Sequence, residues 1–282
     1  MPGTLFVVAT PIGNLEDISA RAIRVLGQVA LIAAEDTRRT GRLLARYGIK
    51  TPTTSLHAHN EKQKTPAIIH RVLAGDDVAL VSDAGTPTVS DPGRQLVRDA
   101  AAAGIRTEPI PGPSAAIAAL SISGFPGDTF TFLGFPPVRS KDRTQWFNRL
   151  DQTRGSIIFF EAPHRIRRTL EELRLRLGEA DVVVTRELTK IHEQLVKQPI
   201  SRAIEALGAP RGEFTIVLFI GDKTENDLSG PPDDTTIADE FAELTQEGAL
   251  ARRQALRELA IRHRLTQRQV YSAVERAKKF VE

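Results

Sequence analysis

The residues best suited to hold a small molecule form a loop that follows a short apolar strand, expected over residues 78–82. The loop reads Ser82-Asp83-Ala84-Gly85-Thr86-Pro87 and closes with Ser90-Asp91-Pro92-Gly93, before a helix expected over residues 94–103. It contains no His, Cys or Lys for catalysis, but small side chains, a carboxylate and backbone polar groups suit close contact with a ligand. Such a loop at the carboxyl end of a buried strand predicts a binding site, with an ordinary strand-to-helix turn as the alternative.

Two other loops in the first half of the chain have a similar composition. Thr10-Pro11-Ile12-Gly13-Asn14 follows a strand expected over residues 5–9, and Pro111-Gly112-Pro113-Ser114 separates a strand at 107–110 from a helix that starts at Ala115. Three strands that end in Gly- and Pro-rich loops predict a cofactor crevice. Neither G-x-G-x-x-G nor G-x-x-x-x-G-K-[ST] occurs, so the expected ligand is something other than a pyrophosphate.

The elements that must position these loops alternate along the chain. Strand-like runs occur at residues 5–9, 29–34, 78–82 and 107–110, with helical patterns at 18–26, 38–47, 61–73 and 94–103. After a Gly- and Pro-rich segment at 124–127, strands are expected at 129–133, 156–160, 181–185 and 213–220, and helices at 141–151, 164–177 and 200–207. This alternation predicts two α/β domains, residues 1–123 and 124–221, with the binding cleft between them.

Composition restricts the class of protein. The 282 residues are 41% hydrophobic and 26% charged, include no cysteine and carry a formal net charge of only +3. Disulfides, thiolate catalysis and cysteine-bound zinc are therefore excluded. The apolar runs are far shorter than the roughly 20 residues that cross a bilayer, and the N-terminus lacks the features of a signal peptide. A cytoplasmic protein without membrane contact is the simplest expectation.

Charge is unevenly distributed near the C-terminus, where residues 222–248 are strongly acidic and residues 249–282 strongly basic. We predict an acidic linker over residues 222–236 and a basic helical module over residues 237–282. Two amphipathic helical patterns, with Thr266 between them as an N-cap, give the module a helix-turn-helix outline. Two interpretations stay open: the module binds nucleic acid, or it is a helical hairpin that packs on the body of the protein or on a dimer.

Taken together, these motifs resemble one family. The matching segments are residues 10–18, Ala34-Glu35-Asp36-Thr37-Arg38, Leu56-His57-Ala58-His59-Asn60-Glu61, residues 81–93, 111–115 and 159–165, and Arg186-Glu187-Leu188-Thr189-Lys190. They are similar, in order and over about residues 4–221, to the ribosomal RNA small subunit methyltransferase I family. The resemblance implies the two-domain fold of the tetrapyrrole methylases, S-adenosyl-L-methionine bound between the domains, and a homodimer. It also implies methyl transfer to the ribose 2′-oxygen of a cytidine in the decoding region of 16S rRNA.

This resemblance, together with the loop chemistry, suggests which residues hold the cofactor. They are Pro11, Gly13, Asp83, Ala84, Gly85, Thr86, Pro87, Ser114, Ala115, Phe160, Glu161, Glu213, Phe214 and Thr215. A sulfonium cation favours a nearby carboxylate, and Asp83 is the one available in the main loop. No metal is expected, because the His57 and His59 pair has only Glu61 as a third ligand and a helix capped by Asn60 accounts for the segment.

A ribose hydroxyl is a weak acid, so the reaction calls for a general base or for groups that stabilise the developing alkoxide. The candidates are Arg38, His59, Glu187 and Lys190. Contact with the substrate, 16S rRNA or the small ribosomal subunit, is expected from Asp36, Thr37, Arg39, His57, Asn60 and Arg165. The structural alternatives are helix capping by Asp36 or Thr37, a solvated helix face for Arg165 and an ordinary ion pair between Glu187 and Lys190. Trp146 and Tyr47 are expected to pack in the interior.

Two other functions remain as alternatives. One is a methylase of the same fold that acts on a tetrapyrrole or on a protein side chain. The other is a nucleic-acid-binding regulator whose α/β body senses a ligand and whose basic tail carries the activity.

Overall fold

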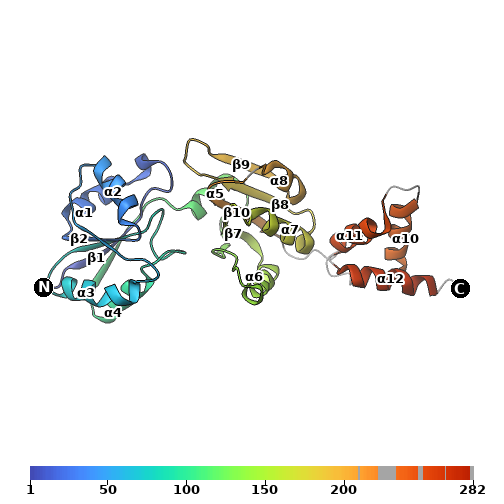
Figure 1. Ribbon diagram of the computed structural model, residues 1–282, viewed down its shortest axis with the longest axis horizontal. Helices are drawn as coiled ribbons and strands as arrows, with labels where there is room; N and C mark the ends of the chain where they lie inside the picture. The colour runs from blue at the N-terminus through green and yellow to red at the C-terminus, as the bar shows by residue number, and fades with distance from the viewer. Residues whose placement is uncertain (209, 222–232, 247–249, 264, 280–282) are drawn as a thin grey trace. The chain divides into compact units, whose positions relative to one another are not determined.

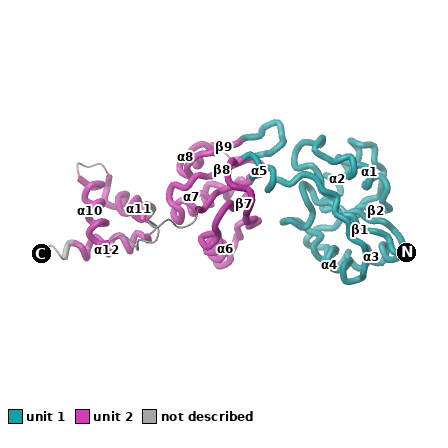
Figure 2. The backbone as a smooth tube through the Cα atoms, turned by 180° about the vertical axis from the view of Figure 1, so that it is seen from behind, with its two compact units in different colours: residues 1–122, 186–194 teal, residues 123–185, 195–282 magenta. Residues whose placement is uncertain are grey.

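The structure is a computed structural model that describes residues 1–208, 210–221, 233–246, 250–263 and 265–279. The chain forms two compact units (Figure 2). The first contains residues 1–122 and 186–194, and the second contains residues 123–185 and 195–282. The first unit therefore includes a short segment from far along the chain, which the expected boundary near residue 123 did not anticipate.

A five-stranded sheet forms the centre of the first unit. Its strands are β1 (Thr4–Val8), β2 (Leu31–Ala34), β3 (Thr53–Ser55), β4 (Val78–Val81) and β5 (Arg106–Ile110), in the order β3-β2-β4-β1-β5. Each pair of neighbours is parallel. Every residue of β2 and β4 is buried, as expected for central strands covered on both faces. The alternating pattern thus correctly predicted a parallel sheet, but β3 was missed because it is short, polar and partly exposed.

Helices cover both faces of this sheet (Figure 1). The elements are η1 (Leu15–Asp17), α1 (Ala20–Gln28), α2 (Thr37–Arg46), α3 (Glu61–Leu73), α4 (Arg94–Ala102) and α5 (Ala115–Ser123). Leu26 of α1 and Leu44 of α2 pack into one hydrophobic cluster, whereas Ile68 of α3 and Leu96 of α4 pack into another. Helices α1 and α2 therefore lie on one face of the sheet and helices α3 and α4 on the opposite face.

The second unit contains a mixed sheet. Its strands are β6 (Phe130–Phe132), β7 (Gly155–Glu161), β8 (Asp181–Arg186), β9 (Gln194–Pro199) and β10 (Phe214–Ile220), in the order β6-β7-β10-β8-β9. Strand β7 pairs in parallel with β6 and antiparallel with β10. Helices α6 (Ser140–Gln152), α7 (Ile166–Leu177) and α8 (Ile200–Ala206) share one hydrophobic core with this sheet. Trp146 belongs to that core and Tyr47 packs against a core of the first unit, so both packing predictions are confirmed.

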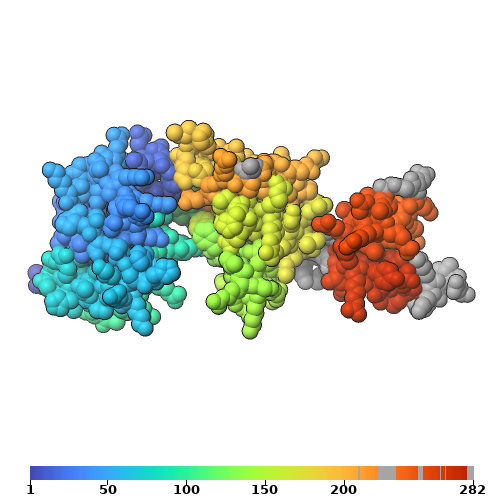
Figure 3. Space-filling model, in the orientation of Figure 1, coloured from blue at the N-terminus to red at the C-terminus, as the bar shows by residue number. Residues whose placement is uncertain are grey.

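Three C-terminal helices, α10 (Asp234–Thr245), α11 (Arg252–Arg262) and α12 (Gln267–Lys279), pack around a core of their own. Their atoms are the orange to red ones in Figure 3. Thr266 caps α12, since its Oγ1 accepts the Gln269 N–H at 3.2 Å, as predicted. Helix α10 was not predicted. Asp233 caps it by accepting the Thr236 N–H at 2.7 Å, so residues 234–236, expected in the linker, form its first turn. Residues 222–232, the rest of the expected linker, lie outside the described residues.

Across the described ranges, the structure contains no helix long and apolar enough to cross a membrane.

Candidate cofactor and substrate site

The connections that follow β1 and β4 diverge to opposite faces of the first sheet, although the two strands are neighbours. The chain passes from β1 to α1 on one face and from β4 to α4 on the other. In open α/β sheets, ligands bind outside the carboxyl ends of strands at such a topological switch point. Here Thr10 and Gly85 bridge the two loops through N–H···O bonds of 2.9 and 3.0 Å. The predicted loops therefore lie together at the position where this architecture binds ligands.

The edge formed by these loops is built from small residues and backbone groups. Thr86 Oγ1 donates to the carbonyl oxygen of Pro113 at 3.4 Å, which ties the third predicted loop to the first two. Gly112 lies so close to Ala9 that an added Cβ would be 3.0 Å from the Ala9 Cβ. Ser82 is only 2% exposed, and its Oγ has no hydrogen-bond partner. Because a buried hydroxyl is normally paired, this oxygen is suited to bond a polar group brought by a ligand.

Reciprocal hydrogen bonds connect the segments that follow β2 and β4. The Glu35 carboxylate accepts the Asp83 N–H at 3.1 Å, and the Asp83 carboxylate accepts the Asp36 N–H at 3.0 Å. Arg39 adds an ion pair with Asp83 at 3.3 Å. Burial, the largest effect, raises the pKa of Glu35, and the neighbouring Asp83 charge acts in the same direction. Both oxygens of Asp83 thus have partners within the protein.

Arg38 pairs with Asp36, which begins helix α2 as its N-cap. Asp36 Oδ1 accepts the Arg38 backbone N–H at 2.8 Å, and Oδ2 lies 2.7 Å from the Arg38 guanidinium. These bonds hold the pKa of Asp36 well below its usual range. The capping alternative for Asp36 is therefore confirmed. The Arg38 side chain is still 88% exposed, so it remains accessible to a phosphate or a hydroxyl group.

Hydrogen bonds from Asn60 hold the segment that contains His57 and His59. Asn60 Oδ1 accepts the His57 backbone N–H at 2.8 Å, and Asn60 Nδ2 donates to Ser55. Asn60 occupies the N-cap position of α3, as predicted, but its side chain makes no capping bond to the helix. The rings of His57 and His59 meet edge to face at 6.0 Å, and the buried His57 Nδ1 has no partner.

Glu187 and Lys190 lie in the β8–β9 connection, which belongs to the first unit. Their side chains form an ion pair, with Lys190 Nζ 3.0 Å from Glu187 Oε1. An added Cβ on Gly13 would lie 2.5 Å from Lys190 Cγ, and Thr189 Oγ1 accepts the Asn14 N–H at 3.0 Å. The structure therefore brings the Glu187–Lys190 pair to the β1 loop at the carboxyl edge of the first sheet.

Backbone strain is concentrated in two of these loops. In the part of the chain that the structure describes, the non-glycine residues with positive φ are Thr88 and Ser90 in the β4 loop and Glu187 and Thr189 in the β8–β9 connection. Each such residue costs on the order of 1–3 kcal/mol, a cost that proteins tolerate mainly at functional sites. The backbone strain is therefore a second, independent indication that these two segments, which the sequence motifs also pointed to, are functional.

The site residues predicted in the second unit are brought together at one end of β7 and β10. Phe214 is paired with Glu161 and Thr215 with Phe160 in the antiparallel register. The Glu161 carboxylate is fully buried and bonds to Ala162 N, Thr169 Oγ1 and the Arg165 guanidinium. The Phe214 side chain packs in the hydrophobic core. Any ligand contact by Glu161 or Phe214 would therefore be made through the backbone.

The Arg165 side chain is less accessible to RNA than the sequence suggested. Its guanidinium lies 2.6 Å from Glu161 and donates to the Pro136 carbonyl oxygen at 2.9 Å, and its side chain is 18% exposed. The solvated-face alternative fits its neighbour Arg168, which is 74% exposed and pairs with Glu172.

The list of predicted site residues left out Glu35 and Glu61, and also Ser82, although Ser82 opens the predicted loop; the structure places all three at the same edge as the predicted residues. A signal existed for Glu35, because it directly follows the last apolar residue of β2. In the described residues, no group of three or more His, Cys, Asp or Glu side chains is arranged to hold a metal ion.

Comparison with known proteins identifies the family. The family model of the tetrapyrrole (corrin/porphyrin) methylases matches residues 4–204. Ribosomal RNA small subunit methyltransferase I of Pseudomonas aeruginosa is 50% identical over 221 residues, which cover 77% of this chain and 78% of that protein. The protein of the same name from Synechocystis is 44% identical over 272 residues, which cover 95% of this chain and 96% of that protein. The chain belongs to the ribosomal RNA small subunit methyltransferase I family of tetrapyrrole methylases.

Solved structures support the fold of this family. The uroporphyrin-III-C-methyltransferase of Thermus thermophilus has a TM-score of 0.57 at 20% identity and covers 77% of this chain and 94% of its own. A diphthine synthase has a TM-score of 0.64 at 16% identity, with 79% and 91% covered. At these identities the likeness shows the fold alone. The resemblance to the ribosomal RNA small subunit methyltransferase I family, first drawn from motifs, is confirmed.

Proposed function

We propose that this member of the ribosomal RNA small subunit methyltransferase I family transfers a methyl group from S-adenosyl-L-methionine to the ribose 2′-oxygen of a cytidine in the decoding region of 16S rRNA. The proposal rests on relatives with that name at 44–50% identity over most of the chain. The alternatives, a tetrapyrrole or protein methylase and a ligand-sensing regulator, are not favoured. The solved tetrapyrrole methylase is only 20% identical, and the α/β body matches a family of enzymes.

The residues at the carboxyl edge of the first sheet fit such a cofactor. When bound, S-adenosyl-L-methionine supplies an electrophilic methyl group on a sulfonium centre. We assign the contacts of the first unit to Pro11, Gly13, residues 83–87, Ser114 and Ala115, and those of the second to Phe160, Glu161 and residues 213–215. The unpaired Ser82 Oγ and the close-packed glycines support this assignment, because they leave backbone and hydroxyl groups to bind the ligand.

We assign the activation of the acceptor hydroxyl to the side chains that surround these loops. Arg38 and Lys190 offer positive charge to stabilise a developing alkoxide, while the imidazole of His59 is able to accept a proton. Glu187 holds Lys190 at 3.0 Å and so fixes the position of its ammonium group. We assign contacts with rRNA to Asp36, Thr37, Arg39, His57 and Asn60. Arg165 is the weakest of the predicted contacts, because Glu161 holds its guanidinium and its side chain is only 18% exposed.

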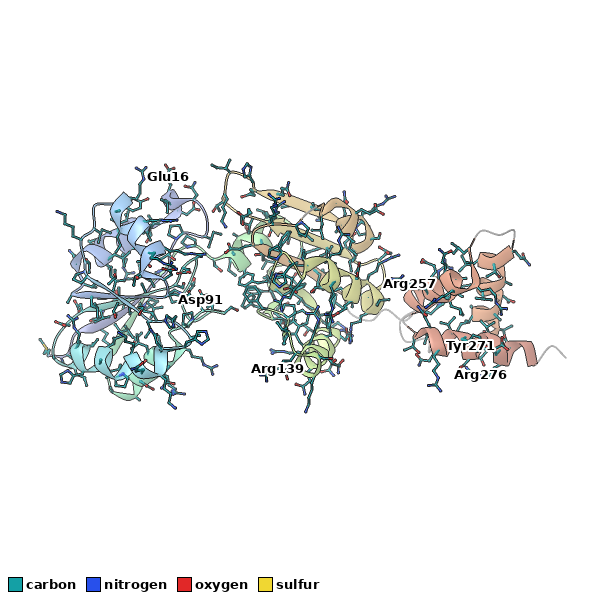
Figure 4. The ribbon with its side chains drawn as sticks, viewed as in Figure 1. Glu16, Asp91, Arg139, Arg257, Tyr271 and Arg276 are labelled. Carbon is teal, nitrogen blue, oxygen red and sulfur yellow. The ribbon has the colours of Figure 1, made fainter. Side chains whose placement is uncertain are left out.

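The C-terminal helices serve, in this proposal, as a module that holds RNA. Within it, the acidic Asp234 and Glu240 are paired with Arg276 and Arg262. Arg253, Arg257 and Arg268 remain exposed, as does Tyr271, which Figure 4 labels on α12. Pairing within the module thus neutralises acids that would repel phosphate, while exposed arginines are left to attract it.

We also propose that the protein acts in the cytoplasm as a homodimer. Phe130 on β6 and Phe219 on β10 are 44% and 38% exposed. Exposed large apolar side chains on a sheet are typical of a surface that a second subunit covers. Sedimentation of the purified protein tests the dimer, and a monomer at micromolar concentration would contradict it.

Transfer of tritiated methyl groups from S-adenosyl-L-methionine to small ribosomal subunits that lack the modification tests the reaction. The labelled nucleotide is expected to resist alkaline cleavage, because that cleavage requires a free 2′-hydroxyl. A label in RNA that remains alkali-labile would move the reaction to a base, and transfer to protein alone would overturn the proposal.

Alanine variants of Arg38, His59, Glu187 and Lys190 distinguish chemistry from binding. A residue that acts only in the transition state lowers kcat and leaves cofactor affinity nearly intact, with losses of roughly 10²–10⁴ for a general base. Wild-type turnover in all four variants would place the reacting groups elsewhere.

A further inference from the structure

Both ends of the β4 loop, residues 82–93, are held by glutamates that come from other parts of the first unit. At its start, Glu35 accepts the Asp83 N–H at 3.1 Å. At its end, Glu61 Oε1 accepts the N–H groups of Gly93, Gln95 and Leu96 at 3.1, 2.6 and 3.3 Å. Neither glutamate is among the residues assigned above to the cofactor, to the substrate or to the chemistry.

Glu61 replaces a capping side chain that α4 lacks. The N-cap of α4 is Gly93, at φ 108°, which has no side chain to accept the first N–H groups of the helix. The first N–H groups of a helix need hydrogen-bond acceptors, and the positive end of the helix dipole favours an anion. The Glu61 carboxylate is both an acceptor and an anion. A residue with a capping side chain does not fit in place of Gly93, because an added Cβ would lie 2.5 Å from Leu80 Cδ2.

The segment between these two anchors is under strain. Thr88 and Ser90 have φ angles of 73° and 65°, and Val89 between them is 43% exposed. Asp91, labelled in Figure 4, follows in the same loop. Strained backbone persists only where the surrounding structure fixes it. Bonds from Gly85 to Thr10 and from Val89 to Thr86 hold the middle of the loop, and the bonds to Glu35 and Glu61 add a constraint at each end.

We propose that Glu35 and Glu61 are positioning residues for methyl transfer, which hold the two ends of the β4 loop so that its backbone keeps the arrangement that binds the cofactor. This inference rests on the proposed assignment of that loop to S-adenosyl-L-methionine. Glu35 has a second effect, because the Asp83 that it holds in turn bonds the Asp36 N–H at 3.0 Å. The cofactor loop and the arginine segment of α2 are therefore fixed by one pair of reciprocal bonds.

The test compares Ala and Gln at both positions. Glutamine keeps a carbonyl oxygen to accept an N–H, whereas alanine removes the acceptor. Glu35→Ala and Glu61→Ala are expected to weaken binding of S-adenosylhomocysteine at least tenfold, about 1.4 kcal/mol, in calorimetry below the melting temperature. Glu35→Gln and Glu61→Gln are expected to stay within about threefold of wild type, because the hydrogen bonds remain.

Glu108→Ala is the matched control. Glu108 lies on β5 in the same unit and pairs with Arg21 and Arg106, away from the β4 loop. The Glu108→Ala protein should be less stable than wild type but should keep the wild-type affinity for S-adenosylhomocysteine. An equal loss of affinity in Glu108→Ala, or wild-type affinity in both Ala variants at positions 35 and 61, would overturn the proposal. If Glu61→Ala does not fold, Glu35→Ala and the two Gln variants still decide it.

Hydrogen exchange separates this inference from the proposed function. The amides of Gly93, Gln95 and Leu96 are expected to exchange faster in Glu61→Ala than in Glu61→Gln or wild type, with or without ligand. A wild-type protein that failed to bind S-adenosylhomocysteine would contradict the assignment of the loop. Unchanged amide exchange in Glu61→Ala would contradict the positioning role itself.

Discussion

At the scale of single residues, the acidic side chains at the carboxyl edge of the first sheet mainly accept backbone N–H groups. Asp36 caps α2, Asp83 accepts the Asp36 N–H, and Glu61 caps α4. Residue type alone would suggest general bases or cation ligands for these groups. Their geometry shows instead that these carboxylates fix the loops, while the side chains of Arg38 and Arg39, paired with Asp36 and Asp83, are 88% and 61% exposed.

Glu35 gives a pH-dependent prediction. Burial raises its pKa, so the folded state holds the proton more tightly than the unfolded state does. The stability that Glu35 contributes is therefore present at low pH and is lost as the pH rises through the raised pKa. Glu35→Gln keeps the acceptor and carries no charge. Its Tm should match wild type below the ordinary glutamate pKa of 4.5 and exceed it at pH values above the raised pKa. A difference in Tm that does not change with pH would contradict this account.

Gly13 gives a second residue-level prediction. In Gly13→Ala, the new Cβ would lie 2.7 Å from the Leu188 carbonyl oxygen and closer still to Lys190. Overpacking of this kind costs about 1–3 kcal/mol and should displace the Glu187–Lys190 turn. We expect a lower Tm together with reduced kcat. The matched control is Gly27→Ala in α1, where nothing lies within 4 Å, and there a gain of about 0.5–1 kcal/mol is expected. A Gly13→Ala protein with wild-type turnover would separate that turn from catalysis.

At the scale of elements, the sequence predicted the parts of the fold whose pattern is local. Strands β2 and β4 are continuous apolar runs, and Thr266 with Gln269 has the spacing of a capping box. Strand β9 was missed because Gln194–Pro199 is mostly exposed and lacks apolar alternation. Helix α10 was missed because its cap, Asp233, lies in a segment whose Pro and Asp content is typical of a linker.

The candidate site was predictable only in part, for a similar reason. The three loops were found because Gly, Pro and small polar residues directly follow apolar runs. The contact between Glu61 and Gln95 spans 34 residues, and that between Asn14 and Thr189 spans 175. Contacts of this kind depend on which strands become neighbours. A single sequence without the sheet order does not supply that information.

The C-terminal module gives a prediction at this scale. Phe241 of α10 is 7% exposed and contacts the shared core of α11 and α12. Phe241→Ala should cost about 3–5 kcal/mol and unfold these three helices, because so small a core has little stability to lose. Hydrogen exchange that is faster than in wild type, and only in α10–α12, would show that these helices unfold. Glu243→Ala, on an exposed position of the same helix, is the control and should leave exchange unchanged. Unchanged protection in Phe241→Ala would mean that the helices are held by something other than their own core.

At the scale of the whole molecule, the chain combines bodies whose hydrophobic cores are separate. Among the residues that the structure describes, the core shared by α6, α7 and α8 includes none from the C-terminal helices, and the core of those helices includes none from before Ile237. The apolar faces of α11 and α12, which had to pack against some partner, pack against α10. The described hydrophobic residues of the module thus pack mainly on one another, while α11 also contacts α7.

A chain that ends at Asp222 tests what the module does. We expect it to keep the Tm and the cofactor affinity of the full chain, because the other cores are complete. Its affinity for small-subunit RNA should fall, with a shallower dependence on salt, since each lost phosphate contact removes close to one unit of slope. Arg268→Ala in the full chain should reproduce part of that change. A lower Tm with an unchanged salt slope would assign the module to packing instead.

The position of residues 186–194 in the first unit also has a consequence for biosynthesis. Chains are made from the N-terminus, and domains generally fold as they emerge. The five strands of the first sheet are complete by Ile110, yet Thr189 and Lys190 reach their partners Asn14 and Gly13 only after residues 123–185 of the second unit have been synthesised. A nascent chain released before residue 186 would present the cofactor loops without Lys190. Residues 186–194 are thus the last part of the first unit to be synthesised.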